Sequence, residues 1–86
     1  MSVLGSESRD LCLTFQPGWE APTGKGLLGN DRRVRTVRRV LVSYPGVRHI
    51  LPDRISLDPG IDTRLLESMA VFLERQRWLV KTVEIR

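Results

Sequence analysis

Residues 24–29 hold the pattern that comes closest to a chemical motif. They read Gly-Lys-Gly-Leu-Leu-Gly, which fits the G-x-G-x-x-G pattern of dinucleotide-binding loops. In those loops a strand leads into the first glycine, and the glycines let the backbone approach a pyrophosphate. Here residues 19–23 separate the first glycine from the nearest strand pattern, and 86 residues are too few for the doubly wound sheet that carries this motif. The spacing therefore predicts a glycine-punctuated loop and no cofactor.

Nucleophiles, bases and metal ligands are few and scattered. Cys12 and His49 are the single cysteine and the single histidine, and nothing in the sequence indicates that they meet as nucleophile and base. Cys12 has the position of a half-buried strand residue, where a thiol is usually inert. Asp53, Asp58 and Asp62 occupy turn and helix-cap positions, which account for them without catalysis. We therefore predict no enzyme and no metal site.

Arginine dominates the charge. Residues 32–54 contain seven arginines and one acid, Asp53, for a net charge of +6, whereas the whole chain carries +4. Positive charge concentrated in one region is typical of a surface that meets an anion. Arginine also outnumbers lysine twelve to two over the chain, so codon bias and simple solvation of a helix are the alternative explanation.

These arginines fit two kinds of anionic partner. Guanidinium groups on one helix face can contact nucleic-acid phosphates without reading sequence. The same groups can pair with the carboxylates of an acidic protein, as in an adaptor, an inhibitor or an assembly subunit. The aromatic content of 6% favours contact with the nucleic-acid backbone over base stacking. Nucleic acid is the first alternative and an acidic protein the second. For either partner the predicted binding residues are Arg32, Arg33, Arg35, Arg38, Arg39, Lys25 and Trp78.

The hydrophobic pattern predicts the elements that position these side chains. Apolar and polar residues alternate over residues 11–16, as in a half-buried strand. Residues 31–44 have helical periodicity, with apolar side chains on one face and arginines on the opposite face. The remaining predicted elements are strands at 47–51 and 54–57, a helix from Asp62 to near Arg77, and a strand at 78–85.

This order of elements predicts a fold. Strand, helix, strand, strand, helix, strand is the split βαβ pattern of a small ferredoxin-like α+β domain, in which two helices cover one face of a four-stranded antiparallel sheet. If residues 47–51 are helical instead, a winged helix is the alternative. We predict a flexible tail at residues 1–10, one domain over residues 11–86, and a mobile glycine-rich loop at residues 17–30.

The last strand suggests a second surface. Strict alternation places Leu79, Val83 and Ile85 on one side of this strand and Trp78 and Val80 on the other. In a two-layer fold one sheet face has no helices over it. An apolar group around Trp78 on that face would be a binding or homodimerisation surface, whereas a tryptophan that covers the edge of the core is the alternative.

Composition excludes several classes of protein. Apolar residues make up 41% of the chain and charged residues 28%, which is ordinary for a folded protein. No apolar run approaches the length of about 18 residues that a membrane span requires. The amino-terminal residues lack the basic-then-apolar order of a secretion signal. We therefore expect a small basic protein of the cytoplasm that does not associate with membranes.

Overall fold

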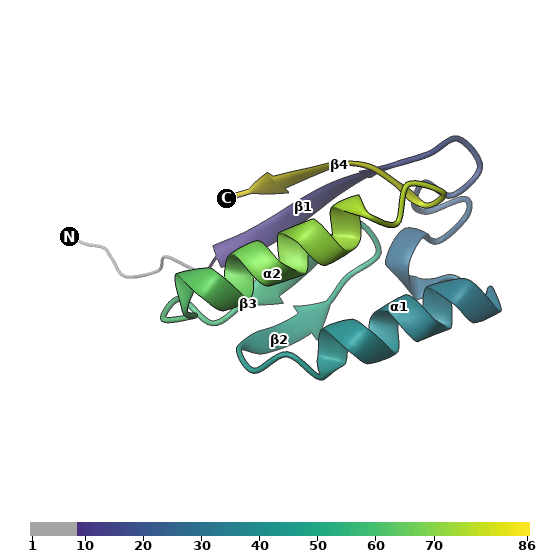
Figure 1. Ribbon diagram of the computed structural model, residues 1–86. Helices are drawn as coiled ribbons and strands as arrows, with labels where there is room; N and C mark the ends of the chain where they lie inside the picture. Colours follow the sequence, from purple (N-terminus) through teal and green to yellow (C-terminus); the bar gives the residue numbers. More distant parts are fainter. Residues whose placement is uncertain (1–8) are drawn as a thin grey trace.

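The protein folds as a ferredoxin-like α+β domain (Figure 1). The computed structural model describes residues 9–86. Its elements are β1 (Arg9–Phe15), the short 3₁₀ helix η1 (Gly26–Leu28), α1 (Arg32–Val42), β2 (Val47–Ile50), β3 (Arg54–Leu57), α2 (Thr63–Glu74) and β4 (Val80–Ile85). The strands form one sheet in the order β2-β3-β1-β4, in which all neighbours are antiparallel. The predicted fold is confirmed, and because β2 is a strand the winged-helix alternative is wrong.

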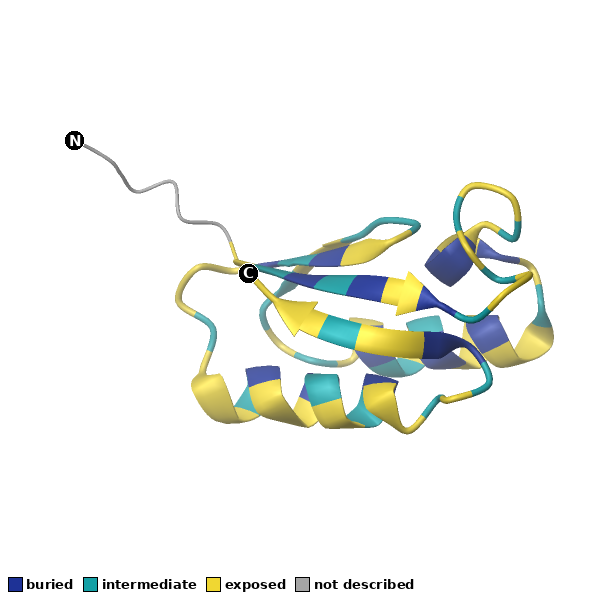
Figure 2. Ribbon diagram, turned by 90° about the horizontal axis from the view of Figure 1, so that it is seen from above, coloured by how far each residue is buried: buried dark blue, intermediate teal, exposed yellow. Residues whose placement is uncertain are grey.

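The core lies between the sheet and the two helices. In Figure 2 both helices lie below the strands, with buried positions turned toward them. Strand β1 crosses the middle of the sheet and contributes Leu11, Leu13 and Phe15 to the core. From α1 the buried side chains are Val34, Val37 and Leu41, and from α2 they are Leu66, Met69 and Leu73. These are the apolar positions that helical spacing predicts for one face.

Aspartates fix where both helices begin. The side chain of Asp31 accepts a 2.7 Å hydrogen bond from the backbone N–H of Arg33, and Asp62 does the same for Arg64. Each aspartate satisfies a backbone donor that the first helical turn leaves unpaired. Helix α1 ends at Val42, two residues earlier than predicted, ahead of the Pro45-Gly46 turn.

Strand β1 begins earlier than the sequence predicts. Arg9 and Asp10 pair with Leu57 and Ser56 of β3, so they belong to the sheet and not to a flexible tail. The rest of the predicted tail, residues 1–8, lies outside the described residues. The strand ends at Phe15, one residue before the predicted boundary at Gln16.

A β-bulge in β4 changes which residues face the core. Thr14 pairs with Thr82, but Phe15 pairs with Val80, so Lys81 is an extra residue in β4. An extra residue reverses the alternation of side chains beyond it. Val80 is therefore 3% exposed and faces the core beside Phe15, where strict alternation placed it on the open face.

Trp78 also lies differently from the prediction, because it belongs to the turn before β4 and not to the strand. Trp78 precedes β4 and packs against Trp19 on the helix side, with ring centroids 5.2 Å apart. The predicted apolar group around Trp78 on the open sheet face is therefore wrong.

The loop at residues 17–30 is attached to the core through η1. Leu27 is fully buried, and its backbone N–H donates to the carbonyl of Pro52 in the β2–β3 turn. The backbone N–H of Gly26 donates to the carbonyl of Trp19, which closes the loop on itself. Mobility of the loop stays a prediction, but its Gly-Leu-Leu segment packs between β1, the β2–β3 turn and α1.

Candidate anion-binding groove

The five arginines of α1 divide among three directions around the helix. Arg32 and Arg39 point away from the core, because each lies about half a turn from the buried side chains. Arg35 and Arg38 lie on the flank that faces β2, and Arg33 lies on the flank that faces the two tryptophans. Helical periodicity predicts Arg32, Arg35 and Arg39 opposite the apolar stripe, with Arg33 and Arg38 flanking them, and the structure adds which neighbour each flank faces.

A groove of about 600 Å³ runs between α1 and β2. We call it the arginine groove, and it is lined by Arg35, Arg38, Arg39, Val42, Val47, Arg48, His49 and Ile50. Four of these eight side chains are guanidinium groups, and no carboxylate is among them. A cleft lined by one sign of charge concentrates its potential and attracts counter-ions. The arrangement therefore suits an extended anion.

Arg38 is held by the protein itself. Its Nη1 atom donates 2.7 Å hydrogen bonds to the carbonyl oxygens of Leu27 and Gly29. These charge-assisted bonds join α1 to the glycine loop and satisfy two backbone acceptors there. Arg38 thus anchors the loop. It still lines the groove, but two carbonyl oxygens already engage its Nη1 atom.

The other guanidinium groups of the groove are free to bind. Arg35, Arg39 and Arg48 are exposed, and within residues 9–86 ion pairs join only Arg33 to Asp31 and Arg86 to Glu84. An exposed arginine without a carboxylate partner keeps its fork of N–H donors available for phosphate or carboxylate oxygens.

Apolar side chains also line the groove. Val42 is 65% exposed, the highest value among the large hydrophobic side chains of the described region, and Val47 and Ile50 are half-buried beside it. Strand β2 is also an edge of the sheet, so the backbone groups on its outer side have no strand partner. The groove can therefore hold an apolar group as well as an anion.

Lys25 does not line the groove. It is exposed, has a left-handed backbone with φ of 63°, and precedes η1. The structure therefore does not bring this predicted binding residue together with Arg35 and Arg39.

Arg33 and Trp78 belong to a separate cluster on the other flank of α1. The guanidinium carbon of Arg33 lies 4.5 Å from the ring centroid of Trp78 and 5.5 Å from that of Trp19. Arg33 also pairs with Asp31 at 3.4 Å. The backbone N–H of Arg33, and then its side chain, hold the pKa of Asp31 below the ordinary value, so this carboxylate stays charged at the helix N-terminus.

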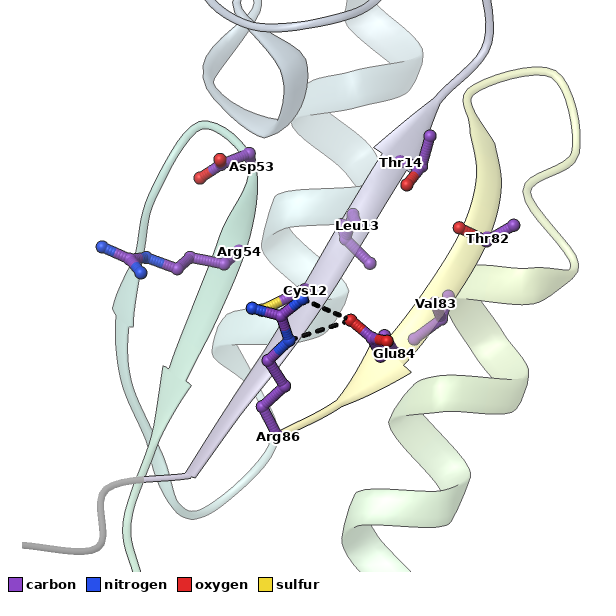
Figure 3. A pocket seen from close by; sticks show the side chains of 9 residues that line it. All are labelled: Cys12, Leu13, Thr14, Asp53, Arg54, Thr82, Val83, Glu84 and Arg86. Atoms are coloured by element: carbon purple, nitrogen blue, oxygen red, sulfur yellow. Dashed lines mark hydrogen bonds and ion pairs between the residues drawn. The ribbon is translucent and has the colours of Figure 1, made fainter.

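The open sheet face is polar and carries both signs of charge. Cys12, Thr14, Arg54, Thr82 and Glu84 share this face because they pair directly across the strands. Figure 3 shows them with Asp53 and Arg86 around a shallow pocket of about 500 Å³. Arg86 pairs with Glu84 at 2.8 Å, and this bond raises the pKa of Arg86. A polar face of mixed charge lacks the apolar surface on which the homodimer prediction depended.

Cys12 and His49 do not form a pair. Cys12 lies on β1 and His49 on β2, with β3 between them, so about two strand spacings of 4.8 Å separate their backbones. Over residues 9–86 no group of three or more histidine, cysteine, aspartate or glutamate side chains is placed to hold a metal ion. In the same range no helix is long and apolar enough to cross a membrane.

Sequence reasoning missed five of the eight lining residues of the groove, which are Val42, Val47, Arg48, His49 and Ile50. Arg48 was counted in the basic region but was not assigned to the site. The tight Pro45-Gly46 turn was the available signal, because a strand that follows a helix so closely folds back alongside it.

Comparison with known proteins adds no assignment. The chain matches no protein-family model, no curated protein and no solved structure. Function is therefore inferred from the groove and its surroundings.

Proposed function

We propose that this protein is a non-enzymatic binding domain that uses the arginine groove to hold the phosphate backbone of a nucleic acid. One observation carries the proposal: four guanidinium groups and no carboxylate line a groove between a helix and an edge strand. Phosphates along a nucleic-acid strand present a row of negative charges, and arginine binds them with paired N–H donors. Arg35 and Arg39 on the helix and Arg48 on the strand are the contacts.

The proposed binding does not depend on base sequence. Contacts to phosphate and sugar position a protein on nucleic acid but carry no direct sequence information. Three phosphate contacts alone give weak binding, which increases when the ligand is long enough to be held at further points. The cytoplasmic location that the sequence predicts stays a prediction.

An acidic protein segment is the second candidate. The exposed Val42 among the lining arginines favours it, because nucleic-acid phosphates have no use for an apolar side chain. An extended peptide that alternates acidic and apolar residues could lie along the free edge of β2, with carboxylates on Arg35 and Arg48. In that case the apolar side chain on Val42 carries most of the affinity and the effect of salt is smaller.

Salt dependence separates the two candidates. We expect a fluorescently labelled single strand of mixed sequence to bind with an affinity that falls about 20-fold between 50 and 200 mM salt, as three phosphate contacts on a single strand predict. Fluorescence anisotropy measures this binding, with an acidic peptide of equal net charge as the competitor. Binding that ignores salt, or no binding at 50 mM, contradicts the proposal. Preferential binding of the peptide supports the second candidate.

A further inference from the structure

A second concave site lies on the opposite flank of α1 from the arginine groove. This site, which we call the tryptophan pocket, has a volume of about 270 Å³. It is lined by Arg32, Arg33, Thr36, Val37, Val40, Phe72, Gln76 and Trp78. Two aromatic side chains, two arginines and an amide therefore surround one small pocket between α1 and the end of α2. At about 30 Å³ for each water molecule, this volume is that of about nine waters, which leaves room for a planar ring.

The aromatic wall of this pocket is held in place by its neighbours. Trp19 packs edge-on against Trp78 at an interplanar angle of 78°, and the guanidinium group of Arg33 lies over the Trp78 ring. Gln76 donates from Nε2 to the carbonyl of Phe72 at 3.1 Å and accepts from the indole N–H of Trp78 at 3.3 Å. A side chain held in this way loses little entropy when a ligand stacks on it.

The tryptophan pocket and the arginine groove lie on either side of the outer face of α1. Arg32 lines the pocket, and Arg35 and Arg39 line the groove. A helix with its side chains is about 10–12 Å across, a distance that a few nucleotides cover. A strand whose phosphates lie in the groove can therefore cross over the helix and deliver a base to the pocket.

We infer that the tryptophan pocket takes an unstacked base, so that the ligand of this domain is single-stranded nucleic acid. This inference rests on the proposed function, because the groove supplies the backbone contacts. Bases of single strands can be splayed out to stack on aromatic rings and on guanidinium planes, whereas those of a duplex are already paired and stacked. The stacking surfaces are Phe72, the guanidinium group of Arg33 and the part of Trp78 that lines the pocket beside this group. Since any base can stack on these surfaces, the protein distinguishes single strands from duplexes but does not distinguish base sequences.

Tryptophan fluorescence tests the inference, because Trp19 and Trp78 are the only tryptophans of the chain. The two ligands are a thymidine 12-mer and an abasic 12-mer of equal length and charge. We expect the thymidine strand to quench the fluorescence and to bind about 10-fold more tightly, the effect of one stacked base. The abasic strand should bind through phosphates alone and leave the fluorescence unchanged.

A matched pair of variants locates the base. Thr36→Leu places a larger side chain in the tryptophan pocket from an exposed position of α1, without changing charge. Thr63→Leu makes the same change at the start of α2, where Thr63 is exposed and outside the pocket. We expect Thr36→Leu to remove the preference for the thymidine strand, with binding of the abasic strand unchanged, and Thr63→Leu to behave as wild type.

The outcomes separate this inference from the proposed function. Equal, salt-dependent binding of both strands without quenching overturns the base pocket but supports the groove. A preference for thymidine that survives Thr36→Leu also overturns the pocket as the site of stacking. If neither strand binds, both the inference and the proposed function are wrong.

Discussion

Replacing Gly26 with alanine is expected to lower the free energy of unfolding by about 3 kcal/mol, the largest effect on stability that we predict for a single methyl group. Gly26 has a φ of +47°, a conformation that costs side-chain-bearing residues about 1–2 kcal/mol. A Cβ atom there would also overlap the carbonyl oxygen of Pro52 and lie 2.9 Å from the ring of Phe15. Neither neighbour can move freely, because one is backbone and the other is buried.

Thermal unfolding followed by circular dichroism measures this loss. For a domain of this size, 3 kcal/mol corresponds to a fall in Tm of about 15 °C. Gly18→Ala is the control, since Gly18 also has a positive φ, +93°, but its added Cβ would meet nothing within 4 Å. That variant should lose only about 1 kcal/mol. Equal, small losses of unfolding free energy in both variants would contradict the close packing of η1 against Pro52 and Phe15. The expected difference between the two variants would show that Gly26 is needed for close packing. A role in letting a phosphate approach the backbone, as in dinucleotide-binding loops, would not be required.

The double variant Arg35→Glu/Arg39→Glu is expected to bind a single strand at least about 50-fold more weakly than wild type at 50 mM salt. Each phosphate contact on a single strand releases counter-ions and contributes about 0.7 to the slope of log affinity against log salt. Loss of two of the three contacts therefore reduces the slope from about −2 to about −0.7. Repulsion between the new carboxylates and the strand weakens binding further.

The matched control is Arg64→Glu/Arg75→Glu, which makes the same change in net charge in α2 and at the residue that follows it. Both arginines are exposed and lie outside the arginine groove. Anisotropy titrations at several salt concentrations measure both variants, and circular dichroism verifies that both are folded. If the control loses as much affinity as the groove variant, binding depends on total charge and the groove is not the site.

Most of the fold could be predicted from the sequence because local signals and tertiary packing agree. Asp62 caps α2 as the sequence predicts, and α1 ends within two residues of its predicted boundary, ahead of the Pro45-Gly46 turn. Alternating apolar residues in β1 face the core as their period requires.

The parts that failed depend on long-range contacts. The bulge at Lys81 arises from how β4 pairs with β1, and it moves Val80 to the core face without a signal in β4 itself. The position of Trp78 is set by Trp19 and Arg33, both distant in sequence. The use of Arg38 as an anchor for the glycine loop likewise depends on contacts between α1 and η1.

The arginine groove was only half predictable. The charge of α1 could be identified from its sequence, because the apolar stripe assigns the arginines to the exposed side. The contribution of Arg48 could not, since it requires β2 to lie at the edge of the sheet next to α1. Helical periodicity alone separates Arg33 from Arg35, but only the packing of α1 shows that Arg33 meets the two tryptophans and Arg35 faces β2.

The most direct test of the central claim is to map a bound single strand on the protein by NMR. In ¹⁵N-labelled protein titrated with a single-stranded 12-mer, we expect the largest shifts at the Nε–H groups of Arg35, Arg39 and Arg48. The neighbouring amides of β2 should shift as well, and resonances of Thr14 and Thr82 on the open sheet face should stay unchanged. Shifts centred on the open sheet face, or none in the arginine groove at saturation, would contradict the account.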